Sequence, residues 1–218
     1  MIREEVLREA GIHEGKLLNA LIFDLGNVLI DIRLDRTFEA FRQLGLKQFD
    51  ELYTFEKQIP LFTDYETGRI STEQFRQGLR SFLSDGIADE SIDRAWLAML
   101  GELPAEHVRL LQRLQRRYSL YLLSNTNEMH VRYFTSQAGA KYGEGIFNRL
   151  FVKTYYSNEI HLRKPDPEVY EFVVKDAGLK KSSLLFIDDS MVNVEGARRA
   201  GLPAYCLKEK NLLSLFSF

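Results

Sequence analysis

Carboxylate, hydroxyl, amide and ammonium groups stand at a few places in this 218-residue sequence where they could act together. Five of them directly follow apolar runs: Asp24, Ser124, Asn125, Asp188 and Asp189. A sixth, Lys164, precedes the segment Pro165-Asp-Pro167. These residue types suit phosphoryl transfer, because an aspartate can attack phosphorus and Mg²⁺ prefers oxygen ligands such as carboxylates. A hydroxyl, an amide and an ammonium can bind the oxygens of the transferring group, and Lys164 would also keep Asp24 ionised.

The apolar runs are typical of strands that are buried on both faces of a sheet. We expect strands at residues 17–23, 120–123, 150–152, 183–187 and 203–207. Amphipathic patterns between them predict helices at residues 104–117, 128–139, 167–177 and 192–200. This alternation predicts an α/β protein with a Rossmann-like, doubly wound parallel sheet. Such sheets bind ligands outside the carboxyl ends of their strands, so the polar residues should converge in one crevice.

Residues 34–99 interrupt the alternation, because their patterns are helical and include no comparable strand. Helices are expected at residues 35–44, 49–58, 71–83 and 90–100, and Ser71 with Gln74 predicts a capping box. We interpret this block as a helical cap inserted after the first strand. The catalytic core then comprises residues 17–33 and 100–218, and residues 1–16 form an N-terminal extension with a short amphipathic helix.

Composition narrows the classes of partner. Lys and Arg number 29 against 31 Asp and Glu, a net charge of −2, so neither nucleic acid nor an anionic membrane is expected. The single cysteine, Cys206, cannot form an intramolecular disulfide or a cysteine metal cluster. No apolar run approaches the ~18 residues of a membrane span, and the N-terminus does not resemble a signal peptide. The expected location is the cytoplasm, and the expected partner is a small phosphorylated molecule. The oligomeric state is not predicted.

Four segments, in this order and spacing, resemble the motifs of the haloacid dehalogenase-like (HAD) hydrolase superfamily. They are Phe23-Asp-Leu-Gly-Asn-Val28, Leu122-Leu-Ser-Asn125, Arg163-Lys-Pro-Asp-Pro167 and Phe186-Ile-Asp-Asp-Ser190. The resemblance extends from about residue 18 to the C-terminus. The first motif and the segment Glu66-Thr-Gly-Arg-Ile-Ser71 look like the helical-cap subgroup that includes α-D-glucose-1-phosphate phosphatase.

The resemblance implies a role for each matching residue. Asp24 is the nucleophile that forms an aspartyl-phosphate, and Ser124 and Lys164 bind phosphate. Mg²⁺ is held by the Asp24 carboxylate, the Gly26 carbonyl and Asp188, with Asp189 close by or in the outer shell.

Gly26 departs from the family pattern. It stands where most phosphatases of the superfamily carry a second aspartate that acts as general acid and base. A general acid contributes ~10²–10⁴-fold to rate, and its loss matters least for acidic leaving groups. The sequence therefore predicts that sugar 1-phosphates are hydrolysed in preference to sugar 6-phosphates.

Three functions are compatible with these residues. The first is a Mg²⁺-dependent phosphatase acting on a small phosphorylated metabolite, with sugar phosphates among the candidates. The second is a 2-haloacid dehalogenase, because those members also lack the second aspartate, although their fourth motif lacks the acidic metal ligand kept here. The third is a catalytically weak regulatory or binding protein. His130 is expected on the protein surface in all three.

Overall fold

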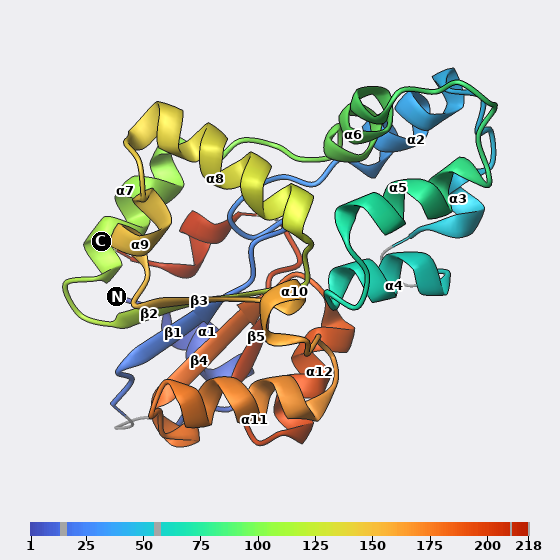
Figure 1. Cartoon of the computed structure of the whole chain (residues 1–218). Helices are drawn as coiled ribbons and strands as arrows, with labels where there is room; N and C mark the ends of the chain where they lie inside the picture. The colour runs from blue at the N-terminus through green and yellow to red at the C-terminus, as the bar shows by residue number, and fades with distance from the viewer. Residues whose placement is uncertain (14–16, 55–57, 210, 218) are drawn as a thin grey trace.

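The computed structural model describes residues 1–13, 17–54, 58–209 and 211–217. In this part of the chain, five strands form one parallel sheet in the order β3-β2-β1-β4-β5 (Figure 1). The strands are β1 (Ala20–Phe23), β2 (Ser119–Ser124), β3 (Lys153–Tyr156), β4 (Leu184–Asp188) and β5 (Ala204–Cys206). The first strand lies at the centre between β2 and β4, so the segment that carries Asp24 has neighbours on both sides.

Alternating side chains of the strands enter two separate cores. Leu21 and Phe23 of β1 face one core, whereas Ala20 and Ile22 face the other. The first core is covered by α1 (Glu4–Glu9), α7 (Ala105–Leu114), α8 (Glu128–Tyr142), α9 (Ile146–Leu150) and the 3₁₀ turn η2 (Leu212–Leu215). The second is covered by α11 (Pro167–Asp176) and α12 (Met191–Arg199). Helices on both faces of a parallel sheet confirm the predicted Rossmann-like, doubly wound architecture.

Five further helices among the described residues form a cap beside the sheet (Figure 1). They are α2 (Leu34–Gln43), α3 (Phe49–Leu52), α4 (Pro60–Glu66), α5 (Thr72–Arg80) and α6 (Asp89–Leu97). Their shared core is aromatic, with Trp96 in contact with the rings of Phe49, Phe62 and Phe75. The capping box at Ser71 is present, with both of its hydrogen bonds to Gln74. The inserted helical cap is thus confirmed, and its boundaries at residues 34 and 99 stay a prediction.

Two expected elements are wrong. The apolar residues at 150–152 are not a strand, because Leu150 ends α9 and the strand that follows is β3. Leu150 and Phe151 are buried in the core whereas Val152 is exposed, and their hydrophobicity carries no information about backbone geometry. The helix expected at 49–58 ends at Leu52, and residues 55–57 lie outside the described part of the chain. Pro60 opens α4, which the sequence analysis missed.

The end of α4 touches the core at the short helix α10 (Ser157–Ile160). The Ser157 hydroxyl lies 2.6 Å from the Glu66 carbonyl oxygen, and Nδ1 of His161 lies 2.8 Å from the Thr67 carbonyl oxygen. Gly68 has a φ of +66°, and a Cβ built on it would lie 2.2 Å from the carbonyl oxygen of Asn158. Backbone atoms of the cap therefore rest directly on the core here, at a spacing that only glycine permits.

The two termini pack together at one edge of the core. Ile2 forms an antiparallel bridge with Phe216, and both side chains are buried in the first core together with Val6 of α1. No helix among the described residues is both long and apolar enough to cross a membrane.

Candidate active site

The register of the sheet brings the predicted residues together at the carboxyl ends of the strands. Phe23 pairs with Ile187 of β4, so the next residues, Asp24 and Asp188, lie level with each other. The Asp24 amide donates to the Ile187 carbonyl at 2.9 Å and continues the ladder past the end of β1. On the other side Ser124 ends β2 and is buried.

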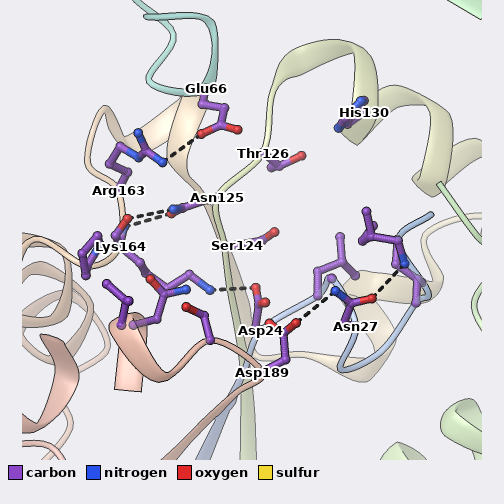
Figure 2. Close-up of a pocket in the computed structure, with 18 of the residues that line it drawn as sticks. Asp24, Asn27, Glu66, Ser124, Asn125, Thr126, His130, Arg163, Lys164 and Asp189 are labelled. Atoms are coloured by element: carbon purple, nitrogen blue, oxygen red, sulfur yellow. Dashed lines mark hydrogen bonds and ion pairs between the residues drawn. The ribbon is translucent and has the colours of Figure 1, made fainter. Parts of the chain in front are cut away.

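Lys164 links the two aspartates. Its Nζ lies 2.7 Å from Oδ1 of Asp24 and 2.6 Å from Oδ2 of Asp188, and its side chain is 1% exposed. The Asn125 amide holds the lysine backbone, accepting from the Lys164 N–H at 2.9 Å and donating to its carbonyl at 2.8 Å (Figure 2). The Asn125 side chain thus positions Lys164. The predicted contact between Asn125 and phosphate stays a prediction.

The neighbouring carboxylates Asp188 and Asp189 have different surroundings. Asp188 has no exposed surface, and it accepts from Lys164, from the Ser190 amide at 2.8 Å and from Asn193 Nδ2 at 3.1 Å. Asp189 lines the cavity and accepts from Asn27 Nδ2 at 3.0 Å (Figure 2). Asp188 therefore holds the lysine, whereas Asp189 faces the space where a ligand would bind.

Burial disfavours the charged forms of the carboxylates in this cluster. It raises the pKa of Asp24 to about 7, with help from the charges of Asp188 and Asp189 and against the opposing effect of Lys164. Burial and the charge of Asp188 also raise the pKa of Asp189. Burial acts to lower the pKa of Lys164, but Asp188 and Asp24 outweigh it and hold that pKa above its usual value. An additional cation would relieve the repulsion among the three carboxylates.

The donor set fits Mg²⁺. Asp24, Asp188 and Asp189 each offer a carboxylate oxygen, and these oxygens lie within 4.8 Å of one another. Mg²⁺ takes oxygen ligands at about 2.0–2.1 Å in an octahedron, and one or two protein carboxylates usually suffice. Gly26 lines the same cavity, so its carbonyl stays a predicted ligand.

The cavity at these strand ends has a volume of about 730 Å³ and reaches from the core to the cap. Of the predicted site residues it is lined by Asp24, Gly26, Ser124, Asn125, Lys164 and Asp189. Several other residues line the cavity and are not predicted from the sequence, namely Asn27, Gln58, Glu66, Thr126, Arg163 and Asn193. Asn27 and Arg163 lie within the quoted family motifs, so their place beside the site could have been inferred from neighbouring motif residues. Gln58 lies in no motif, so nothing in the sequence pointed to it.

His130 also lines the cavity, and the expectation that it lies on the surface is wrong. It is 6% exposed, and its ring stacks on Trp96 with 4.8 Å between centroids. Burial lowers its pKa to about 3, so the imidazole is neutral near pH 7. The sequence around it is polar because the first turn of α8 faces the cavity and the cap, which a helical pattern alone does not reveal.

A side chain at position 26 would make a tight contact with Ile32, which would have to shift by a few tenths of an ångström. A Cβ built on Gly26 would lie 3.0 Å from Cγ1 of Ile32. Ile32 lines the cavity as well, so the wall beside Gly26 is apolar where other family members are expected to carry an acid.

Fold and site together define the molecule as a capped α/β hydrolase. The family model of the haloacid dehalogenase-like hydrolases matches residues 18–201. D-ribitol-5-phosphate phosphatase from Bacteroides thetaiotaomicron is 29% identical over 189 residues, which cover 87% of this chain and 91% of the relative. Phosphatase MT3486 from Mycobacterium tuberculosis is 45% identical over 193 residues, covering 86% of each.

A solved structure is also similar to this chain. It is a HAD family enzyme from Bacteroides thetaiotaomicron in complex with magnesium and inorganic phosphate, 33% identical to this chain. The match has a TM-score of 0.84 and covers 92% of this chain and 100% of that one. The chain belongs to the haloacid dehalogenase-like hydrolases.

Proposed function

We propose that the chain is a Mg²⁺-dependent phosphatase that hydrolyses a small phosphorylated metabolite through an aspartyl-phosphate on Asp24. The observation that carries the proposal is the Asp24 carboxylate at the end of the central strand, held 2.7 Å from the buried ammonium of Lys164 beside two further carboxylates. The phosphatase names of the relatives and the phosphate in the similar solved enzyme support the same chemistry.

In the proposed reaction, an oxygen of Asp24 attacks phosphorus and the bond from phosphorus to the ester oxygen breaks. The ester oxygen takes a proton from solvent water and leaves as the alcohol. A water molecule then attacks phosphorus, returns a proton to solvent, releases inorganic phosphate and restores the Asp24 carboxylate. Lys164 and the Ser124 hydroxyl bind the phosphoryl oxygens, and Asn125 keeps Lys164 in place. Mg²⁺ held by these carboxylates would neutralise charge on them and on the phosphoryl group.

The contacts favour Asp189 over Asp188 as the carboxylate that reaches the metal directly. Asp188 is fully buried and engaged by three hydrogen-bonding groups, whereas Asp189 lines the cavity. This reverses the order given by the sequence analysis and keeps the same set of residues, with the Asp24 carboxylate and the Gly26 carbonyl as the other protein ligands.

The direct test is hydrolysis of p-nitrophenyl phosphate by the native protein and by Asp24→Asn, with Mg²⁺ and with a chelator. We expect turnover that needs Mg²⁺ and is lost in the variant, whose circular dichroism spectrum should stay native. A beryllofluoride phosphate mimic should bind to Asp24. Turnover of a 2-haloacid that survives chelation would instead favour the dehalogenase, and inactivity of the native protein on both substrates would favour the regulatory protein.

The preference for sugar 1-phosphates stays a prediction. The apolar contact between position 26 and Ile32 supports it, because no acid stands at that point of the wall to protonate a poor leaving group. The comparison is kcat/KM for glucose 1-phosphate and glucose 6-phosphate in the native protein and in Gly26→Asp combined with Ile32→Ala, which makes room for the new side chain. Equal efficiency on both esters in the native protein would contradict the prediction.

A further inference from the structure

Three polar side chains form a cluster on the wall of the cavity between the cap and the core. Gln58 and Glu66 belong to the cap segment, and Arg163 directly precedes Lys164. The Glu66 side chain is 7% exposed, with Oε2 3.2 Å from Nη2 of Arg163. Gln58 Nε2 donates to Oε1 of Glu66 at 3.3 Å. Figure 2 shows Glu66 and Arg163 beyond Asn125, on the side away from Asp24. We call these three residues the polar cluster.

Two members of the polar cluster each have a buried atom without a hydrogen-bond partner among the described residues. These atoms are Oε1 of Gln58 and Nε of Arg163, whereas Oε2 of Glu66 is ion-paired with the Arg163 guanidinium at 3.2 Å. Buried polar atoms are nearly always hydrogen-bonded in folded proteins, so two in one cavity wall need an explanation. An acceptor and a donor in the same wall match hydroxyl groups, because a hydroxyl can donate to one neighbour and accept from another.

Attachment of the cap does not explain these side chains. At this point the cap is anchored by backbone atoms, namely the carbonyls of Glu66 and Thr67, and by the close approach of Gly68 to Asn158. The Glu66 side chain adds an ion pair with Arg163 of the core, and this pair still leaves Oε1 of Gln58 and Nε of Arg163 without partners. The Glu66 side chain is not needed to hold Lys164, whose backbone is bound by Asn125.

We propose that Gln58, Glu66 and Arg163 form a hydroxyl-binding subsite that selects phosphate esters of polyhydroxylated alcohols, such as sugars and polyols. The inference rests on the proposed phosphatase function and names the substrate class of that same cavity. A second phosphate is a poorer match, because Glu66 offsets the charge of Arg163 and would repel an anion. An unsubstituted alkyl chain is poorer still, because it leaves Oε1 of Gln58 and Nε of Arg163 without partners.

The test compares two primary esters of equal carbon number, D-ribitol 5-phosphate and n-pentyl phosphate, in the native protein, Glu66→Gln and Gln58→Leu. The native protein should favour the ribitol ester in kcat/KM by about 100-fold or more, since sites built to bind hydroxyls discriminate strongly against analogues that lack them. Each variant should lose roughly 10- to 100-fold on the ribitol ester and less than about 3-fold on the pentyl ester. Glu39→Gln, an exposed carboxylate of α2 in the same cap, is the matched control and should leave both values unchanged.

Each alternative outcome is informative. Equal losses on both esters would overturn the subsite in favour of a structural role for the polar cluster, and so would unchanged ratios in the variants. Comparable native efficiency on both esters, with normal turnover of p-nitrophenyl phosphate, would overturn the subsite and leave the proposed function intact. A native protein that hydrolyses none of these esters with Mg²⁺ would overturn both. Thermal unfolding of each variant separates loss of binding from loss of folding.

Discussion

At the scale of single residues, the site is organised around one ammonium shared by two carboxylates. Lys164 is almost completely buried, so its charge needs both Asp24 and Asp188 for compensation. The arrangement fixes one oxygen of Asp24 and leaves the other to the cavity side. Asp188 therefore stabilises the buried Lys164 charge, a role that Asp189 does not have although the two residues are adjacent in the sequence.

Paired variants test this division of roles. Asp189→Asn should weaken Mg²⁺ binding by roughly 10-fold or more while changing the free energy of unfolding little, because its carboxylate is only partly buried and faces the cavity. Asp188→Asn should lower that free energy by roughly 1–3 kcal/mol, since it removes one partner of a buried charge. Mg²⁺-dependent thermal shifts report the first quantity and urea unfolding the second. The reverse pattern would return direct ligation to Asp188.

His130 predicts a pH dependence of stability. Its pKa falls from 6.5 to about 3 on burial, so the folded state holds the neutral ring. A depressed pKa contributes stability that is fully present above pH 6.5 and is lost as the pH falls from 6.5 towards 3. At pH 5 the loss from this group is about 2 kcal/mol relative to pH 8. His130→Gln should flatten the difference in unfolding free energy between these pH values by that amount. Parallel profiles for the two proteins would mean that His130 does not titrate as a buried group.

At the scale of elements, the strands and helices that have a clear apolar pattern could be predicted from the sequence. Apolar runs located four of the five described strands, and the position of Asp24 and Asp188 after two of them predicted their meeting at one sheet edge. The strand expected at 150–152 failed because hydrophobicity reports burial, which Leu150 achieves at the end of a helix. The polar cluster could not be predicted, because Glu66 and Arg163 meet only through the docking of the cap on the core.

That docking makes Gly68 a test of the cap as an element. Gly68→Ala adds left-handed backbone strain and a collision with the Asn158 carbonyl, and we expect a loss of roughly 2–5 kcal/mol in unfolding free energy. Gly86→Ala is the matched control, because Gly86 also has a positive φ of +84° but its Cβ would meet nothing within 4 Å. The control should lose only the strain, roughly 1–2 kcal/mol. Urea unfolding of both variants measures the difference, and equal losses would mean that the cap end is not held against α10.

At the scale of the whole molecule, the cavity and the contact between the two termini lie at opposite ends of the strands. The cavity lies at the carboxyl ends of the strands. The cap lies beside the sheet (Figure 1). The termini meet near Tyr118, just before β2 begins, where Met1 and Ser217 line a second pocket. The described residues 1–13, which lie outside the motif resemblance, therefore contribute Ile2, Val6, Ala10 and Ile12 to the hydrophobic core and do not line the cavity.

This separation predicts that α1 contributes stability without affecting catalysis. Val6 is 3% exposed and packs in the core that also contains Leu215 and Phe216, so Val6→Ala should cost roughly 1–3 kcal/mol through lost burial and a small cavity. In a chain of this size that corresponds to a fall in Tm of about 2–4 °C per kcal/mol. Glu5→Ala, on the exposed side of the same helix, should change stability by less than about 0.5 kcal/mol. Below the unfolding transition, kcat and KM should be equal in the native protein and both variants, because no described residue of α1 lines the cavity. A fall in kcat in Val6→Ala at full folding would show that packing of the termini reaches the strand ends, and would refute the separation.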